Sequence, residues 1–334
     1  MWYPLLRPAL FALDPERAHA LTLEALRLAG RRHRVRFDGP PVECLGLKFP
    51  NRVGLAAGFD KNAVAVDGLG RLGFGFIEVG TVTPRAQGGQ SRPRLFRLPA
   101  AGALVNRLGF PNEGAAVVAA RVKRVRYSGV VGVNIGKNAA TPLERAVDDY
   151  VECLRVLGPV AGYLAINVSS PNTPALRDLQ SRSRLEPLLS ALLAERRRLG
   201  LRVPLLLKVS PDLDPLEVKD IASLVRELPL DGVIATNTTL ARGAFAGSAR
   251  VPAGGLSGRP LKSRALESVA AFRSALPSSA TIIGVGGVDS GTAAQALRAA
   301  GADLVALYTG LVYRGPSLVR ECVRALEDSP RVSR

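Results

Sequence analysis

Histidine and cysteine are scarce in this chain, and their scarcity excludes several kinds of site. Among 334 residues there are two histidines and three cysteines. His19 and His33 lie near the start, and Cys44, Cys153 and Cys322 are far apart, so no group has the spacing of zinc ligands. No G-x-S-x-G elbow or Walker A motif is present. We therefore expect no metal site and no hydrolase triad, and we expect reduced thiols in a cytosolic protein.

Long apolar runs and signs of export are also missing. No stretch approaches the roughly 18 consecutive apolar residues of a membrane-spanning helix. The start of the chain has neither the basic region nor the apolar region of a secretory signal. With 47% hydrophobic and 22% charged residues, the composition is typical of a globular protein with a large core.

Acidic residues are outnumbered by basic ones. The chain has 45 Lys and Arg against 28 Asp and Glu, which gives a formal net charge of +17. Such a surface favours anions, whether nucleic acid, acidic lipid or an anionic substrate. Charge alone does not choose among these partners, because scattered arginines are also found on an ordinary solvated surface.

Short apolar segments that end in small polar residues recur along the chain. Val53–Ala57 is followed by Gly58-Phe59-Asp60-Lys61, and Tyr163–Ile166 is followed by the run 167–174 of amides, hydroxyls and prolines. Such strand ends are where α/β proteins keep their sites. About eight of these segments, all with polar residues at the same end, predict a (β/α)8 barrel. The predicted strands begin near Val53, Phe76, Val130, Tyr163, Leu205, Gly232, Ile282 and Leu304.

The first 38 residues do not follow the barrel pattern. Asp14-Pro15-Glu16 is a strong helix start, and apolar residues recur at helical spacing from there to Gly30. A second amphipathic helix is predicted before it, with an apolar face made of Trp2, Leu5, Leu6, Ala9, Leu10 and Leu13. Arginines flank both helices, four of them between 31 and 36. Two such helices either lie on an anionic bilayer or cap the barrel, and the sequence leaves both open.

The chain is therefore divided into an N-terminal amphipathic helical segment, 1–38, and a barrel, 39–334. A short hairpin at 40–51 is expected to close the barrel floor. Two segments, Arg85–Phe110 and Arg242–Arg264, are expected to be long irregular loops, because they are rich in Gly, Pro and polar residues. Loops of that length are usually functional or disordered.

Glycines after the last two predicted strands indicate a phosphate site. Gly284-Val285-Gly286-Gly287 does not match the G-x-G-x-x-G motif, because Asp289 stands where the third glycine would be. In a barrel, however, the loops after strands seven and eight commonly bind phosphate. Bare glycines there, including Gly310, expose backbone N–H groups, and Ser290 begins a helix whose N-terminus favours an anion.

The other strand ends carry amides and lysines. Several uncharged amides at one barrel mouth suit a flat heterocycle with C=O and N–H edges. A buried lysine is costly unless it is paired or faces a ligand that gains negative charge. Without a metal, histidine or reactive cysteine, such a site indicates an organic cofactor. The residues concerned are Lys61, Asn106, Asn134, Asn167, Asn172, Lys208 and Asn237.

These motifs, taken in order over nearly the whole chain, resemble the dihydroorotate dehydrogenase family. The resemblance implies a barrel that binds FMN and oxidises dihydroorotate to orotate in pyrimidine biosynthesis, with hydride transfer to FMN. Members with soluble acceptors have a cysteine base where this chain has Ser170, so the resemblance implies the class 2, membrane-associated branch, which passes electrons to a quinone. The matching stretches are 56–61, 80–84, 106–110, 134–138, 167–174, 236–239, 254–258 and 284–287.

The resemblance also assigns roles to individual residues. FMN is expected to contact Ala57, Gly58, Phe59, Asp60, Lys61, Thr81, Asn134, Asn167, Lys208, Thr236, Gly258, Gly286, Gly287, Tyr308 and Thr309. The substrate is expected to contact Lys61, Asn106, Arg107, Leu108, Gly109, Phe110, Asn167, Asn172, Asn237 and Thr238.

Three groups are expected to act in catalysis or electron transfer. Ser170 is the candidate base for the proton at C5 of the substrate, with Thr173 starting a proton relay, since a free serine hydroxyl is a very weak base. Lys208 is expected to stabilise negative charge on the flavin ring. Arg94 and Arg97 resemble residues that line the quinone tunnel.

Three other functions are weighed against this one. A flavin-dependent tRNA dihydrouridine synthase would suit the basic charge but requires a cysteine acid after a strand, and none stands there. A soluble-acceptor dihydroorotate dehydrogenase is disfavoured by Ser170 and the N-terminal helices. A non-enzymatic basic barrel would leave the amides unexplained. We expect a monomer without nucleic-acid partners, held peripherally on an anionic membrane at its cytoplasmic side.

Overall fold

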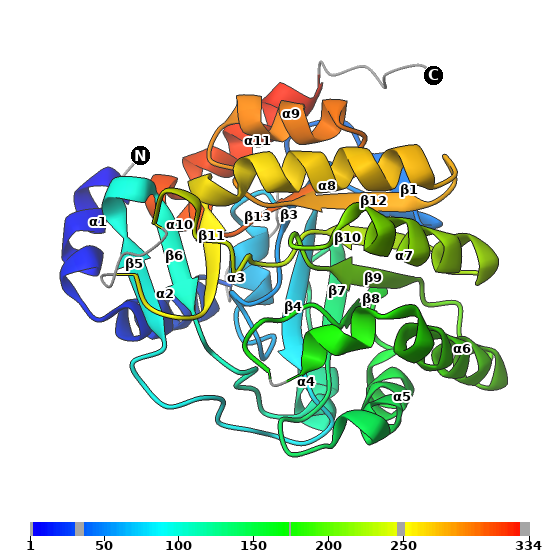
Figure 1. Cartoon of the computed structure of the whole chain (residues 1–334). Helices are drawn as coiled ribbons and strands as arrows, with labels where there is room; N and C mark the ends of the chain where they lie inside the picture. The colour runs from blue at the N-terminus through cyan, green and yellow to red at the C-terminus, as the bar shows by residue number, and fades with distance from the viewer. Residues whose placement is uncertain (1–2, 31–36, 174, 246–250, 328–334) are drawn as a thin grey trace.

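The computed structural model describes residues 3–30, 37–173, 175–245 and 251–327, and its centre is a closed barrel of eight parallel strands (Figure 1). Trp2, His33, the arginines between 31 and 36, and Pro174 lie outside the described residues. Each barrel strand coincides with a segment predicted from the apolar runs. The prediction of a (β/α)8 barrel is therefore confirmed.

The barrel strands pair in the spatial order β10-β12-β13-β3-β4-β7-β8-β9, and β9 closes the ring onto β10. Their bounds are β3 (Val53–Leu55), β4 (Phe76–Val82), β7 (Val130–Ile135), β8 (Tyr163–Asn167), β9 (Leu205–Val209), β10 (Gly232–Ala235), β12 (Thr281–Val285) and β13 (Leu304–Leu307).

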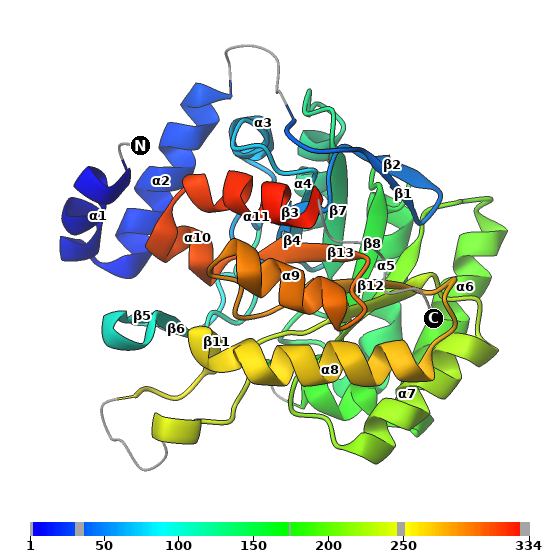
Figure 2. The same ribbon diagram turned by 90° about the horizontal axis from the view of Figure 1, so that it is seen from above.

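Helices surround the barrel and follow its strands in turn (Figures 1 and 2). Their bounds are α3 (Val66–Gly70), α4 (Ala115–Val122), α5 (Ala146–Leu157), α6 (Arg182–Arg198), α7 (Pro215–Glu227), α8 (Lys262–Ala275), α9 (Gly291–Ala299), α10 (Thr309–Arg314) and α11 (Ser317–Glu327). Short 3-10 turns lie at η1 (Pro99–Ala101), η2 (Leu143–Arg145), η3 (Leu176–Gln180), η4 (Gly243–Phe245) and η5 (Arg259–Leu261).

Two aromatic side chains fill the lower part of the barrel, and small residues make room for them. Phe76 and Tyr163 are fully buried there. A Cβ on Gly54 would lie 2.2 Å from the Phe76 ring, and one on Gly132 would lie 2.1 Å from the Tyr163 ring. Glycine at these two strand positions is therefore a packing requirement of the barrel interior.

A hairpin closes the floor of the barrel, as predicted. It consists of β1 (Val42–Cys44) and β2 (Leu47–Phe49), which pair antiparallel. Phe49 is fully buried and meets Phe76 edge-on, with ring centroids 5.6 Å apart. The lower end is thus sealed, and the open end lies at the carboxyl ends of the strands.

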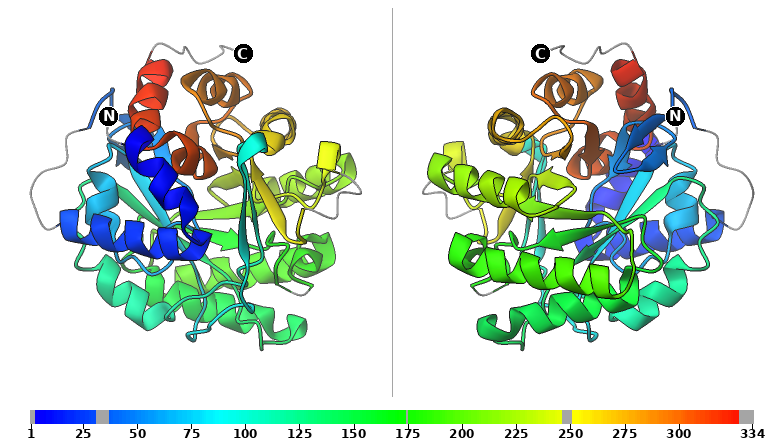
Figure 3. Two further views of the ribbon diagram at one scale, coloured as in Figure 1. Left: turned by 90° about the vertical axis from the view of Figure 1, so that its left-hand side faces the viewer. Right: turned by 90° about the vertical axis from the view of Figure 1, so that its right-hand side faces the viewer.

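The N-terminal segment forms the two predicted helices, α1 (Tyr3–Ala12) and α2 (Pro15–Ala29). They lie together on one flank of the barrel, away from α6 and α7 (Figures 2 and 3). Asp14 caps α2 by accepting the backbone N–H groups of Glu16 and Arg17, each at 3.0 Å. Within the described ranges, no helix has the length and apolarity needed to cross a bilayer.

Two arginines fasten these helices to the barrel. Arg94 is buried, and its Nη2 atom lies 2.7 Å from a carboxylate oxygen of Glu16 on α2. Arg97 donates to the carbonyl oxygen of Leu13 at 2.8 Å, and its guanidinium lies 4.7 Å from the ring centroid of Phe11. The N-terminal helices are therefore held by charge-assisted hydrogen bonds as well as by apolar contact.

The expectation of two long irregular loops is wrong in part. Three strands within them, β5 (Leu95–Leu98), β6 (Ala103–Asn106) and β11 (Gly255–Gly258), form an antiparallel sheet in the order β11-β6-β5. Each strand is only four residues long, so it carries little signal by itself. The pairing of β11 with β6, nearly 150 residues earlier, supplies the backbone hydrogen bonds that stabilise them.

Candidate functional site

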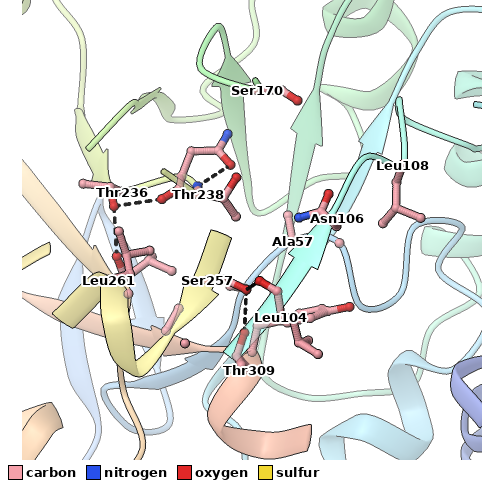
Figure 4. Close-up of a pocket in the computed structure, with 18 of the residues that line it drawn as sticks. Ala57, Leu104, Asn106, Leu108, Ser170, Thr236, Thr238, Ser257, Leu261 and Thr309 are labelled. Carbon is pink, nitrogen blue, oxygen red and sulfur yellow. Dashed lines mark hydrogen bonds between the residues drawn. The ribbon is translucent and has the colours of Figure 1, made fainter. Parts of the chain in front are cut away.

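A pocket opens at the carboxyl ends of the barrel strands, beneath the sheet of β5, β6 and β11. It encloses about 1070 Å³ of free space, counting its open mouth. Figure 4 shows Ser170 on one side of this pocket and Ser257 with Thr309 on the opposite side. The pocket thus has two distinct ends, and the barrel fold places functional sites at this face.

Lys208 on β9 lies deep in the pocket wall and is paired with an acid. Its Nζ atom is 2.9 Å from Oε1 of Glu78 on β4, and both side chains are almost completely buried. Glu78 also accepts hydrogen bonds from Asn134 at 2.9 Å and from Tyr163 at 3.1 Å. A buried ion pair is tolerated more readily when hydrogen bonds satisfy its remaining polar atoms, and both oxygens of Glu78 have such partners.

The amides at the ends of β7, β8 and β10 form one continuous network. Asn167 donates to the side-chain oxygens of Thr81 at 2.9 Å and of Asn134 at 3.0 Å. Asn237 in turn donates to Asn167 at 3.1 Å and to Ser169 at 3.0 Å. This network fixes the orientation of each amide, so the pocket presents preset donors and acceptors to a ligand.

A second pair of amides joins the β-sheet above the pocket to the loop after β8. Asn172 donates to Oδ1 of Asn106 at 2.9 Å. Asn106 ends β6, and its own amide reaches the carbonyl of Gly255 at 3.4 Å. The roof of the pocket is therefore connected to the loop that carries Ser170.

Arg177 holds this loop against the neighbouring strand end. It donates to the carbonyl oxygens of Ser169 at 3.1 Å and Thr238 at 2.9 Å, and it pairs with Asp212 at 2.9 Å. Ser170 itself is buried, and its hydroxyl oxygen accepts the backbone N–H of Asn172 at 3.3 Å. The Ser170 hydroxyl is thus held at a defined position in the pocket wall.

Lys61 lies at the side of the pocket that faces α2. Its Nζ donates to the carbonyl of Gly58 at 2.6 Å. Burial, together with the nearby Arg94, lowers the pKa of Lys61 to about 8. On the same side, burial and the charge of Lys61 lower the pKa of His19 to about 4, so this histidine is neutral at neutral pH.

Glycines form the opposite end of the pocket. Gly286 and Gly287 have φ values of 135° and 69°, and Gly258 has a φ of 92°. A Cβ on Gly287 would lie 2.5 Å from the backbone of Lys262, so any side chain would push this turn away from the start of α8. All three glycines line the pocket and present backbone without side chains there, as an anion-binding turn requires.

Most of the predicted site residues meet in this pocket. Those that line it are Ala57, Gly58, Lys61, Thr81, Asn106, Leu108, Gly109, Phe110, Asn167, Ser170, Asn172, Lys208, Thr236, Asn237, Thr238, Gly258, Gly286, Gly287, Tyr308 and Thr309.

Five other predicted residues support the pocket without lining it. Phe59 lies between the rings of His19 and Tyr308, and Asp60 accepts backbone N–H groups of the following turn at 2.7 and 3.0 Å. Asn134 stands behind the lining amides. Arg107 donates a hydrogen bond to the carbonyl oxygen of Pro93 at 2.9 Å. Thr173 is buried in the loop that carries Ser170. Arg94 and Arg97 lie at the junction with α1 and α2 rather than in the pocket wall.

The sequence-based prediction missed Glu78, which lies behind the pocket wall, and Ser257, which lines the pocket. The signal for Glu78 was an acid inside the strand Phe76–Val82, which has every residue buried. The apolar part of the lining was also missed, because such residues resemble ordinary core. It comprises Ala56, Leu95, Leu104, Leu261, Val285, Val288, Ala306 and Leu307.

None of the three cysteines lines the pocket. Cys153 and Cys322 are buried, and burial raises the pKa of the Cys322 thiol to about 12. Cys44 lies in the floor hairpin, where burial also raises its pKa. Chemistry that uses a cysteine acid therefore has no candidate residue at this site.

Comparison with known proteins gives a consistent result. The family model for dihydroorotate dehydrogenase matches residues 41–329. A protein from Leptothrix cholodnii named dihydroorotate dehydrogenase (quinone) is 52% identical and covers 97% of this chain and 98% of its own length. One of the same name from Methylococcus capsulatus is 54% identical, with coverage of 96% and 98%.

Solved structures agree with the sequence comparison. The ligand-free DHODH of Eimeria tenella superposes with a TM-score of 0.87 at 39% identity and covers 94% of both chains. The complex of DHODH with ferulenol from Eimeria tenella superposes with a TM-score of 0.88 at 38% identity and covers 94% of this chain and 90% of that one.

Proposed function

The chain belongs to the dihydroorotate dehydrogenase family, and from this premise we propose that its pocket oxidises dihydroorotate to orotate in pyrimidine biosynthesis and delivers the electrons to a quinone. It is an oxidoreductase of the quinone-dependent kind. The observation that carries the proposal is the pocket itself, in which nineteen residues assigned to cofactor or substrate, together with the candidate base Ser170, converge on one barrel mouth.

The pocket suits FMN at both ends. At the glycine end, backbone groups of Gly258, Gly286 and Gly287 form a cradle for the phosphate. At the deep end, Lys208 and the network of amides match the polar edge of a flat ring. A side chain at Gly58 would contact only Tyr308, at 3.9 Å, so the glycine there leaves space in the pocket that both residues line.

Residues of the chain would bind and orient the substrate, remove its proton and stabilise charge. FMN, when bound, supplies the acceptor for the two electrons removed from dihydroorotate. Asn106, Asn172 and Asn237 orient the substrate by hydrogen bonds, and Ser170 takes the proton released from its C5 carbon. Lys208 would place its positive charge beside the flavin ring and stabilise negative charge there. Roof and strand ends together exclude water from the reacting atoms.

An anaerobic visible spectrum of the purified protein, recorded before and after adding dihydroorotate, tests this function. We expect a flavin band that bleaches on addition of the substrate. A colourless protein would contradict the cofactor assignment, and a yellow protein that dihydroorotate does not bleach would contradict the substrate assignment.

Substrate affinity should depend on the charge of Lys61. The free-enzyme pKa of Lys61 is lowered to about 8, so the side chain loses its proton as pH rises through that value. Because dihydroorotate carries a carboxylate, we expect KM to rise above pH 8, by up to about tenfold for each pH unit. Steady-state kinetics between pH 6 and 10 measure this.

The variant Lys61→Met provides the comparison for this pH profile. It should have a KM that is raised at pH 7 and flat through pH 8. Lys48→Met, which changes an exposed lysine of the floor hairpin, should behave as the unaltered protein does. An unchanged KM profile in Lys61→Met would remove this residue from substrate binding.

Membrane contact through the N-terminal helices is the second part of the proposal. Nine large hydrophobic side chains are exposed in the described part of the chain, and five of them belong to these helices or to the turn between them. They are Leu5, Leu6, Leu13, Leu21 and Leu28. Exposed leucines flanked by arginines are typical of helices that lie in a bilayer interface, which supports peripheral attachment to a membrane.

A line of aromatic rings connects these helices with the pocket. His19 on α2 lies 5.0 Å from Phe59, and Phe59 lies 5.5 Å from Tyr308, measured between ring centroids. Tyr308 lines the pocket, and Arg94 and Arg97 flank the same junction. This junction is where a quinone from the bilayer would approach the flavin most closely.

Deleting residues 1–36 should separate the two half-reactions. We expect quinone reduction to be lost, because the path from the bilayer is removed, while dihydroorotate still bleaches the flavin. Stopped-flow absorbance measures the first half-reaction, and a quinone assay in detergent measures the second. Glu16→Gln, which breaks the pairing with Arg94, should impair quinone reduction to a smaller extent. Full quinone activity in the truncated protein would disprove this route.

A further inference from the structure

A second cavity lies directly outside the glycine end of the main pocket. Measured as for the main pocket, it holds about 620 Å³ of free space, counting its open mouth. Four residues line both spaces, namely Gly258, Gly287, Val288 and Gly310. The wall between the two cavities therefore consists mainly of glycine backbone. The second cavity opens toward α1, whose Arg7 is part of its lining.

Three arginines give this cavity a positive lining. These are Arg7, Arg259 and Arg314; Asp289 is the one carboxylate in the lining, and Arg314 also pairs with Glu321 outside the lining at 2.9 Å. Each guanidinium is held in place: Arg7 donates to the carbonyl of Tyr313 at 3.1 Å, Arg259 pairs with Asp289 at 3.1 Å, and Arg314 donates to the carbonyl of Asp289 at 2.8 Å.

These anchoring bonds leave capacity for a ligand. A guanidinium carries five N–H donors, and within the described ranges Arg7 and Arg259 each use one of them as a donor to the chain, while Arg314 uses two. Anchored guanidinium groups from three separate elements, α1, η5 and α10, line a space with ample room for a phosphate group. That arrangement matches the way arginines bind phosphate oxygens.

The position of the cavity relative to the exposed leucines suggests the source of the phosphate. Leu5 and Leu6 immediately precede Arg7 on α1, and they are 73% and 57% exposed. A helix that buries these leucines among acyl chains places Arg7 at the depth of the lipid phosphates. The cavity would then face the headgroup layer.

We propose that this cavity binds the phosphate of an anionic phospholipid headgroup through Arg7, Arg259 and Arg314. The inference rests on the proposed membrane contact and gives it a defined site. It also places a bound lipid one backbone layer from the phosphate end of the main pocket, since Gly258 and Gly287 belong to both.

Co-sedimentation with vesicles tests the site without depending on enzyme activity. The probes are vesicles of phosphatidylcholine alone and of phosphatidylcholine mixed with phosphatidylglycerol. The test variant is Arg7→Gln/Arg259→Gln. The control, Arg17→Gln/Arg27→Gln, removes the same charge from α2, and its Arg27 is paired with Glu24 as Arg259 is paired with Asp289.

We expect the test variant to bind phosphatidylglycerol vesicles about tenfold more weakly than the control variant does. Glycerol phosphate, added as a soluble headgroup at constant ionic strength, should compete with vesicle binding by the unaltered protein and not by the test variant. Equal losses in both variants would mean that the attraction is spread over the whole surface, and no loss in either would mean that arginines do not hold the membrane. Both results overturn the proposal.

The flavin content of each variant separates a lipid site from a cofactor site. If the test variant keeps its flavin absorbance and bleaches with dihydroorotate, the cavity is not needed for FMN. If it loses flavin, the three arginines serve the cofactor phosphate and the lipid assignment is wrong. Failure of the proposed oxidation itself would leave the unaltered protein unbleached, which the vesicle assay does not depend on.

Discussion

Replacing Ser170 by alanine should slow the bleaching of bound flavin by dihydroorotate by about 10²- to 10⁴-fold, the range expected for loss of a general base. The flavin itself should remain bound, because Ser170 lies at the end of the pocket opposite the glycine cradle (Figure 4). The variant therefore isolates proton removal from cofactor binding.

The surroundings of Ser170 explain why the effect should be large. A serine hydroxyl is a very weak base, so it must pass its own proton on while it accepts one from the substrate. Ser170 is held by the backbone N–H of Asn172, and Arg177 fixes its loop through the carbonyl of Ser169. Thr173 is buried in the same loop and is the proposed next member of the relay.

Stopped-flow absorbance under anaerobic conditions measures the rate, with Ser257→Ala as the matched control. Ser257 lines the same pocket but lies beside Thr309 at the phosphate end, with their oxygens 2.9 Å apart. We expect this control to retain most of the rate. Thr173→Val should fall between the two if the relay passes through the threonine. Near-normal bleaching in Ser170→Ala would eliminate the serine as the base.

The barrel, and the amides, lysines and glycines at its mouth, could be predicted from the sequence because their signals are local, whereas the other lining residues were assigned only by the family resemblance. Each buried strand is a short apolar run, and each run ends in amides, hydroxyls or glycines. All strands of a parallel barrel point the same way, so the polar residues that follow each strand lie at the same end of the barrel. Asn167, Lys208 and Asn237 were found for this reason, on β8, on β9 and after β10.

The features that could not be predicted from the sequence depend on contacts between segments that are far apart in the chain. The sheet that roofs the pocket requires β11 to pair with β6, and each strand has only four residues, which are too few to be recognised alone. Glu78 was missed because one acid within a strand reveals its purpose only when its partner, Lys208 on another strand, is placed beside it. The cavity outside Gly258 and Gly287 likewise combines arginines from α1, η5 and α10.

The second large effect is expected from replacing Lys208, which is paired with Glu78. Lys208→Ala should leave the carboxylate of Glu78 buried without its cation, which costs about 3–5 kcal/mol when one partner of a buried pair is removed. It also removes positive charge from the deep end of the pocket, where a preorganised charge contributes about 10²- to 10³-fold in rate. A slow or flavin-poor variant alone would not distinguish these two causes.

The double variant Lys208→Met/Glu78→Gln separates them. It replaces the ion pair by a neutral pair of similar size, and the new glutamine oxygen is still positioned to accept from Asn134, as Glu78 does at 2.9 Å. Because neutral replacements of buried ion pairs are often tolerated, thermal unfolding should return close to that of the unaltered protein. Flavin bleaching should nevertheless stay about 10²- to 10³-fold slower, since no cation remains. If the double variant regains both its stability and its rate, Lys208 serves only to neutralise Glu78, and the charge at the deep end of the pocket plays no part in the reaction.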